Sequence, residues 1–359
     1  MPASAAPAGP AASWGVADPP SPAAPTSPTA LCAEAAAHPE WIFCDDFELG
    51  PPTVGVGRYF EIGDDEGDFV RSASSGRDGS YGMRTLWQPG EVGAGGLKVA
   101  FGRNPNGYMN KTRIRPDEDF REIWYRLDVR HDVGWVGDPA KLSRATVFTD
   151  PGDWRQAMIA HLWGDGKGHL LLDPARCVDA SNTVKCRTYN DFDQLDWLGY
   201  QAGTTAVFDT ANGGRWFCVV HHVRLNDPGQ ANGLQELFID GRLEARREGL
   251  DFVRGYRDYA LNAVFIENYW NDGAIKTQGR DFDNLLISAG PIECPPGDGS
   301  GGATATPTVA PTGNPTKTAT LTVPATATEP ATETPSTPPT ASPTAPVTRR
   351  PIHLPRISR

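Results

Sequence analysis

The sequence lacks several features that would assign it to a common class of protein. No run of about 18 apolar residues occurs in its 359 residues, which excludes a membrane-spanning helix. Its six cysteines form no Cys-x-x-Cys pair and no Cys/His cluster with zinc spacing. Basic side chains are outnumbered, 33 against 44, and the net charge of -11 repels phosphate backbones. We therefore expect a monomer with no nucleic-acid partner.

A secretory signal is also lacking, because the N-terminus has neither a basic region nor an apolar region of the required kind. The cysteines and the composition of both ends nevertheless indicate export. Either Met1 lies downstream of the true start or the first segment is a linker of the mature protein. We expect a secreted or cell-surface protein.

Apolar residues that could join a core are scarce at both ends of the chain. Residues 1–39 are rich in Ala and Pro, and residues 295–359 are dominated by Thr, Pro and Ala. Such segments bury too little apolar surface to offset their chain entropy, so we expect both to be disordered, the second as an extended stalk. Residues 40–294 carry the whole net charge and are numerous enough to form one all-β domain.

The central region has the pattern of β-strands. Its apolar residues alternate with polar ones or form short runs, and no window has helical spacing. Asp240-Gly241 supplies the positive φ angles of a tight hairpin turn. The candidate strands are 41–47, 81–87, 96–102, 121–131, 142–149, 155–163, 215–225, 234–240, 260–270 and 281–288. This pattern predicts a two-sheet antiparallel β-sandwich or jelly roll.

The cysteine positions predict disulfides. Cys177 and Cys186 bracket a polar stretch of the kind that closes a hairpin, so we expect them to be bonded. Cys44 lies near the start of the core and Cys294 at its end, and a bridge between them would tie the first strand to the last. Cys32 competes for either partner. Cys218, inside an apolar run, is equally well interpreted as a buried free thiol.

Side chains with hard oxygen ligands gather near the first and last predicted strands. Asp46 and Glu48 follow the first strand, and Asp283 lies in the last. Calcium prefers six to eight oxygen ligands, and jelly-roll carbohydrate modules often bring these two strands together around such an ion. We therefore expect these three residues to hold a structural Ca²⁺, and no other cofactor. The alternative is that they are edge-strand acids that discourage aggregation.

Residues 221–242, HHVRLNDPGQANGLQELFIDGR, resemble the stretch V-x-L-N-x-x-G-x-x-N-G-x-x-x-x-x-x-D-G of concanavalin A-like polysaccharide lyases. The resemblance is to the family-14 lyases that cleave alginate and related polyuronides. AKLSRAT (140–146) stands where that family has a GKLPGL-type strand, and FIENYWNDGA (265–274) where it has a Phe-Phe-Gly-Gly-like strand. The matching residues in the first run are Val223, Leu225, Asn226, Gly229, Asn232, Gly233, Asp240 and Gly241. The resemblance implies a concanavalin A-like jelly roll that recognises polysaccharide.

The resemblance also implies catalytic residues. A lyase for uronate polymers must neutralise the carboxylate, remove the C5 proton and protonate the leaving oxygen. Lys141 matches the position of the family's catalytic lysine, His161 on the next strand is the candidate cationic or base group, and Tyr269 is the candidate proton donor. The sequence departs from the family where tyrosines are replaced by Leu170 and Leu172.

Four further residues are candidates for binding sugar. His222 and Arg224 share one face of a predicted strand, and Asn268 and Trp270 could hydrogen-bond to or stack on sugar rings. Trp and Tyr also occur in ordinary sandwich cores, so the aromatic candidates have a purely structural interpretation as well. The function that follows is polysaccharide recognition, with β-elimination of a uronate polymer as the reaction. The alternatives are a non-catalytic carbohydrate-binding module and a structural cell-surface domain.

Overall fold

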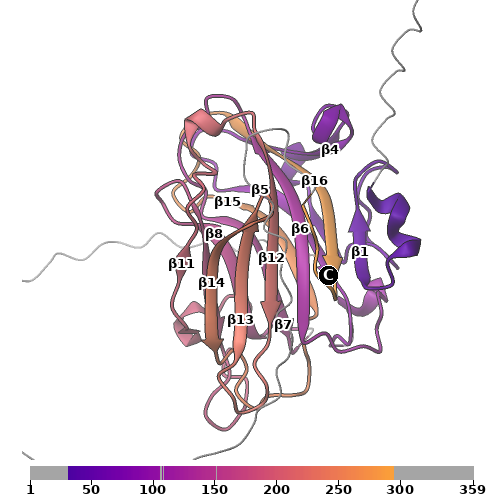
Figure 1. Ribbon diagram of the computed structural model, residues 1–359, viewed down its shortest axis with the longest axis vertical. Coiled ribbons are helices and arrows are strands. Elements are labelled where there is room, and N and C mark those ends of the chain that lie inside the picture. Colours follow the sequence, from indigo (N-terminus) through magenta and orange to yellow (C-terminus); the bar gives the residue numbers. More distant parts are fainter. Residues whose placement is uncertain (1–30, 106, 108, 151, 295–359) are drawn as a thin grey trace, which may run out of the picture. The chain divides into compact units, whose positions relative to one another are not determined.

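The computed structural model describes residues 31–105, 107, 109–150 and 152–294 (Figure 1). The predicted C-terminal stalk and residues 1–30 of the predicted N-terminal segment lie outside these ranges. The described residues start before residue 40, where the domain was expected to begin. There Leu31–Ala37 form a short 3-10 helix, η1. No helix within these ranges is long and apolar enough to cross a membrane.

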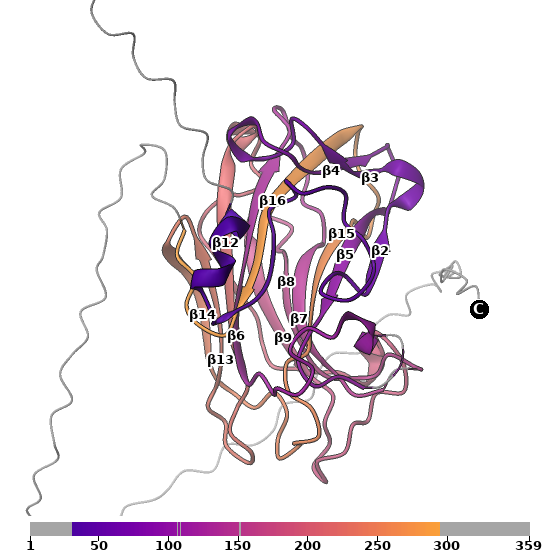
Figure 2. The same ribbon diagram turned by 90° about the vertical axis from the view of Figure 1, so that its right-hand side faces the viewer.

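Two antiparallel eight-stranded sheets make up the fold, as the sequence pattern predicts. Figure 2 shows the two layers side by side. Sheet 1 has the order β14 (Arg242–Leu250), β13 (Gly233–Ile239), β12 (Trp216–Arg224), β6 (Glu122–His131), β16 (Gln278–Ser288), β4 (Gly82–Trp87) and β3 (Phe69–Ser72), with β1 (Trp41–Asp45) also paired to β16. Sheet 2 has the order β10 (Asp196–Trp197), β9 (Leu170–Arg176), β8 (Gln156–Gly164), β7 (Lys141–Phe148), β15 (Ala263–Tyr269), β5 (Gly93–Ala100) and β2 (Glu61–Gly63), with β11 (Gln201–Ala202) paired to β9. The fold is a β-sandwich jelly roll.

The connections between strands contain short 3-10 helices and tight turns. Asp240 and Gly241 have positive φ angles between β13 and β14, so the predicted hairpin turn is confirmed. The 3-10 helices after η1 are η2 (Asp65–Gly67), η3 (Arg77–Gly79), η4 (Met109–Thr112), η5 (Phe192–Gln194) and η6 (Thr210–Asn212). The segment that contains η5 leads into β10 at the edge of sheet 2.

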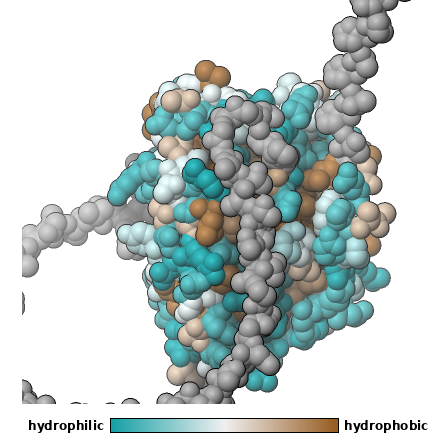
Figure 3. Space-filling view, in the orientation of Figure 1, coloured by the Kyte–Doolittle hydropathy of each residue, from teal (hydrophilic) through white to brown (hydrophobic). Residues whose placement is uncertain are grey.

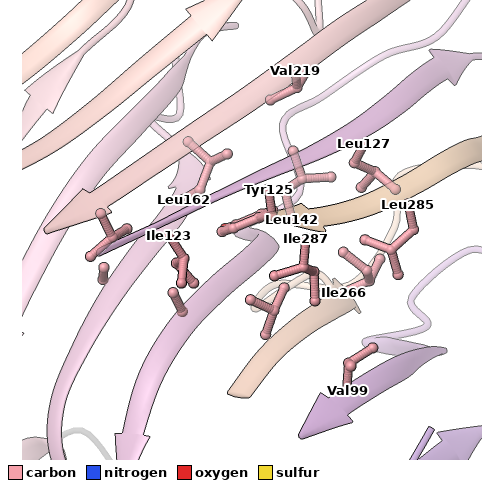
Figure 4. Close-up of a cluster of buried hydrophobic side chains, with 14 of the residues drawn as sticks. Val99, Ile123, Tyr125, Leu127, Leu142, Leu162, Val219, Ile266, Leu285 and Ile287 are labelled. Atoms are coloured by element: carbon pink, nitrogen blue, oxygen red, sulfur yellow. The ribbon is translucent and has the colours of Figure 1, made fainter. Parts of the chain in front are cut away.

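The core lies between the inner faces of the two sheets. On β6, Ile123, Tyr125 and Leu127 are buried because alternate residues of a strand point to the same face. Leu142 and Ile266 from sheet 2 belong to the same cluster, and Figure 4 shows these side chains gathered together. Burial of this apolar surface is the main driving force for the sandwich.

A chain of buried polar groups also connects the sheets. The Tyr125 hydroxyl lies 2.9 Å from Ser143 Oγ and 2.6 Å from His221 Nδ1. Gln235 Nε2 lies 2.8 Å from His221 Nε2 and donates to the main-chain oxygen of His161 at 2.9 Å. Burial lowers the pKa of His221 to about 3, so its ring is neutral. The network thus links β6, β12 and β13 of sheet 1 to β7 and β8 of sheet 2.

Three disulfides are present, and they correct the predicted pairing. The Cys177–Cys186 bond is confirmed. The predicted Cys44–Cys294 bond is wrong, because η1 folds back and brings Cys32 within 5.6 Å of Cys44, Cα to Cα. Cys294 bonds to Cys218 instead. Cys218 is therefore not a free thiol: it lies between the core residues Phe217 and Val219 on β12, so its side chain points to the outer face of sheet 1.

The disulfides should differ in how much they stabilise the fold. Replacing Cys218 and Cys294 by serine opens a loop of 76 residues, which the chain-entropy model rates at about 4.5 kcal/mol. Replacing Cys177 and Cys186 opens a loop of only 9 residues, which that model rates at about 2.5 kcal/mol. Urea denaturation of the two double variants should show this order, and the reverse order would contradict the pairing.

Candidate functional site

Lys141 and Arg144 lie on the outer face of sheet 2 because of a β-bulge. The register of β7 against β8 shifts between Lys141 and Ser143, so Leu142 and Ser143 both face the core. In a regular strand, residues three apart would point to opposite faces. The bulge instead puts Lys141 and Arg144 on the same side, where bulges commonly aim side chains at functional sites.

Lys141 contacts aromatic rings on both neighbouring strands. Its Nζ lies 4.2 Å from the ring centroid of Tyr269 on β15 and 5.9 Å from that of Trp163 on β8. Burial lowers the pKa of Lys141 to about 8, although the negative charge of Glu267 acts to raise it. The structure therefore brings together two of the three predicted catalytic residues, Lys141 and Tyr269. It gives the amine a substantial neutral fraction near pH 8.

A buried ion pair lies beside this lysine. Arg144 is fully buried, and its guanidinium donates to both carboxylate oxygens of Glu267, at 2.8 and 2.6 Å. Arg144 Nη1 also donates to Asn190 Oδ1 at 2.7 Å, which ties the segment before η5 to the sheet. Burial would raise the pKa of Glu267, but the charges of Arg144 and Lys141 hold it below its usual range. The positive charge of Arg144 is therefore balanced by Glu267 inside the protein.

His161 shares this face but cannot serve as a cation. Its ring is fully buried, with Nδ1 2.9 Å from the main-chain oxygen of Asp173. Burial and the charge of Arg144 lower its pKa well below the usual value, so the ring is neutral. It packs against Trp163 at 3.9 Å and stacks on Trp197 at 5.6 Å, centroid to centroid. The ring supports these two tryptophans and has no surface for a substrate to contact.

Sequence reasoning missed Asp173 and Tyr189. Asp173 lies opposite His161 on β9, and burial raises its pKa to about 6. Tyr189 has its ring 5.4 Å from the Arg144 guanidinium, and burial raises its pKa above the usual value. Leu170 and Leu172 both point into the core, so tyrosines at those positions would not reach this face. Strand alternation would have revealed Asp173, but Tyr189 lies in a loop with no such signal.

The four predicted sugar-binding residues do not join Lys141. His222 lies on the outer face of sheet 1, between Glu236 at 2.6 Å and Glu122 at 2.8 Å, and Arg224 is exposed on the same strand. Asn268 is buried and its Oδ1 accepts from Arg280 at 2.6 Å. Trp270 is a core residue beside Trp87 and Trp135. The side chains of Asn268 and Trp270 are thus both buried.

The residues expected to hold calcium each accept hydrogen bonds from main-chain nitrogens. Asp46 accepts from the main-chain nitrogens of Cys32 and Glu48, and Glu48 accepts from that of Tyr81. Asp283 accepts from the nitrogen of Arg77 at 2.7 Å, and burial raises its pKa to about 7. Within the described ranges, no three His, Cys, Asp or Glu side chains are grouped to hold an ion.

A separate pocket of about 430 Å³ lies on the outer face of sheet 1. Arg84 in its wall pairs with Asp132 at 2.7 Å, and Arg130 pairs with Asp281 at 2.8 Å. Its lining charges are thus mutually neutralised, and it contains none of the predicted site residues. Figure 3 shows that the face presenting sheet 1 is largely hydrophilic. Lys141 and Tyr269, on the other sheet, make the stronger candidate site because they combine an amine of lowered pKa with a hydroxyl.

Breaking the buried ion pair should destabilise the protein. Glu267→Gln leaves the Arg144 charge buried without a partner, which should lower the free energy of unfolding by about 3 kcal/mol. It should also lower the pKa of Lys141 further, because the charge of Glu267 raises that pKa. The double variant Arg144→Met, Glu267→Gln should recover much of the lost stability.

The matched control for this ion pair is exposed. Arg103 and Asp119 pair at 2.8 Å with nearly half of each side chain in solvent, so Asp119→Asn should cost less than about 1 kcal/mol. Equal losses for Glu267→Gln and Asp119→Asn in urea denaturation would contradict the burial of the first pair.

Removal of calcium should leave the fold unaffected. An ion that binds only the folded state raises the melting temperature by mass action, but no three His, Cys, Asp or Glu side chains of the described residues are grouped to hold one. Thermal melts with and without a chelator should therefore coincide. A lower melting temperature with the chelator would restore the calcium prediction.

No family model and no curated protein matches this chain. Similar solved structures include an endo-β-1,4-glucuronan lyase from the fungus Trichoderma reesei, with 11% identity and a TM-score of 0.44, covering 66% of this chain and 94% of that one. The marine PL-14 alginate lyase from Aplysia kurodai has 13% identity, a TM-score of 0.43 and coverages of 63% and 88%. An alginate lyase from Chlorella virus has 10% identity, a TM-score of 0.46 and coverages of 64% and 90%. At these identities and TM-scores the activities of those proteins do not transfer to this chain.

Proposed function

We propose that this protein is an exported polysaccharide lyase that cleaves a uronate polymer by β-elimination on the outer face of sheet 2. The observation that carries the proposal is the Lys141 amine, whose pKa is lowered to about 8, positioned 4.2 Å from the ring of Tyr269. Paired acid and base groups with different pKa values suit proton transfer. The sequence resemblance around Lys141 supports the same residue.

The proposed reaction uses one proton acceptor and one donor. The neutral amine of Lys141 removes the C5 proton of the uronate, which the adjacent carboxylate acidifies. The electrons of the C5–H bond form a double bond between C4 and C5, and the bond from C4 to the leaving oxygen breaks. The Tyr269 hydroxyl gives its proton to that oxygen, so the products are an unsaturated uronate and a new chain end.

Lys141 controls the charge of the proposed site. Arg144 pairs with Glu267 and Lys98 pairs with Glu61, so both of these neighbouring cations are neutralised. Below pH 8 the Lys141 ammonium attracts a uronate carboxylate, and above it the amine can act as a base. His161 takes no chemical role in this proposal, because its ring is neutral and fully buried.

Export is the compartment that fits the cysteines. All six cysteines of the chain are paired in three disulfides, which persist in oxidising compartments. A polysaccharide substrate outside the cell is consistent with such a compartment. We therefore propose that the protein is secreted or displayed at the cell surface.

A non-catalytic carbohydrate-binding module is the second candidate function. The neutralisation of Arg144 and the burial of His161 favour it, because a binding surface does not require a free cation beside the base. The two functions differ in one readout. A module would retain polysaccharide in affinity electrophoresis and release no unsaturated product.

Lys141→Ala should abolish the release of unsaturated product from alginate or glucuronan, followed by ultraviolet absorbance. The melting temperature should change little, because a half-buried lysine at the surface contributes little packing. For the wild type, kcat/KM should rise through pH about 8, since the active form of Lys141 is the neutral amine.

Two variants sharpen this experiment. Lys141→Arg keeps the positive charge but cannot become neutral, so it should also be inactive. Lys167→Ala removes an exposed lysine from the turn after β8 and should leave turnover unchanged. No product from any polyuronide with the wild type would defeat the lyase proposal. Activity that falls through pH about 8 would assign Lys141 as a cation instead of a base.

A further inference from the structure

Aromatic residues gather at the edge of sheet 2, beside the proposed site. Phe192 in η5 is 40% exposed, and Trp197 in β10 is 44% exposed. Exposed aromatic rings leave apolar surface in water, and contiguous exposed apolar surface marks a binding surface. The proposed reaction does not use either ring.

The two rings form a supported, nearly parallel stack. The Phe192 and Trp197 centroids are 6.2 Å apart with an angle of 20° between the planes. Trp197 stacks in turn on the buried ring of His161, at 27°, and lies 6.1 Å from the ring of Trp163. His161 is anchored to main chain by its Nδ1 contact with Asp173. The stack, which we name the aromatic platform, is therefore held in place by the sheet beneath it.

The aromatic platform is continuous with Lys141. Trp163 on β8 is the register partner of Lys141 on β7, and Lys141 is the register partner of Tyr269 on β15. Tyr269, Lys141 and Trp163 therefore follow one another across three adjacent strands, and the ring of Trp197, on β10 beyond β9, lies 6.1 Å from that of Trp163. A linear polymer that reaches Lys141 can extend across the strands onto the platform.

We propose that Phe192 and Trp197 stack on pyranose rings of the polysaccharide that lie to one side of the bond cleaved at Lys141. This inference rests on the proposed function. A pyranose ring has an apolar C–H face and hydroxyls at its edge, so aromatic planes suit the face and leave the hydroxyls in water. The aromatic platform thus binds the sugar rings beside the cleaved bond, and Lys141 and Tyr269 cleave that bond.

A protein partner fits this surface less well. Two aromatic side chains that are less than half exposed offer roughly 200 Å², because each can bury about 150–250 Å² in full. A stable protein interface buries about 800 Å² on each partner. One or two sugar rings match the platform in size.

The test measures binding and turnover of aromatic variants of the full chain. Trp197→Ala and Phe192→Ala should each weaken retention in affinity gels of alginate or glucuronan and raise KM about tenfold, with kcat little changed, because stacking contributes to binding in the ground state and transition state alike. Trp197→Phe keeps an aromatic plane and should retain most of the affinity. Short oligosaccharides that cannot reach the platform should be cleaved alike by wild type and variants.

Tyr81→Ala is the matched control, because Tyr81 is 38% exposed and precedes β4 of sheet 1. It should bind polysaccharide like the wild type. Trp197→Ala that binds and cleaves like the wild type would overturn the platform while the proposed function stands. A wild type that neither binds nor cleaves any polyuronide would overturn both. If Trp197→Ala melts far below the wild type, Phe192→Ala becomes the test of the aromatic platform. An unchanged affinity of Phe192→Ala for polysaccharide would then overturn the platform.

Discussion

A guanidinium with no exposed surface lies on the outer face of sheet 2, and it is tolerated there because Glu267 accepts two of its hydrogen bonds. An unpaired buried charge would be strongly destabilising. The same pair also acts on Lys141: burial lowers the pKa of its amine most, Glu267 raises that pKa and Arg144 lowers it. Through Asn190, Arg144 also anchors the segment that carries Phe192 and Trp197. The proposed site and the aromatic platform thus depend on one ion pair.

The fold could be predicted because alternation of apolar residues is a local signal. The Ile123, Tyr125 and Leu127 pattern specifies one buried face of β6, and many strands of this kind separated by turns specify a sandwich. The Cys177–Cys186 bond was also predictable, since the two residues flank one turn. The partners of Cys44 and Cys294 were not, because they depend on where η1 and the end of the chain lie in space.

The site could be predicted only in part. Lys141 and Tyr269 were predicted and lie side by side. The bulge at Leu142 changes which side chains share a face, however, and alternation alone would put Arg144 opposite Lys141. Trp270 was expected near substrate and is in the core, because it lies one residue beyond the outward-facing Tyr269. His161 was predicted to be a cationic or base group, and its burial against Trp163 and Trp197 could not be predicted from the sequence.

We propose that polysaccharide binds on the outer face of sheet 2. A crystal structure of the Lys141→Ala protein with a bound uronate oligosaccharide would show where the sugar lies. The sugar chain should cross β15, β7 and β8, with the reacting ring beside Tyr269 and a further ring on Trp197. An oligosaccharide bound instead in the pocket between Arg84 and Arg130 on sheet 1 would contradict this placement.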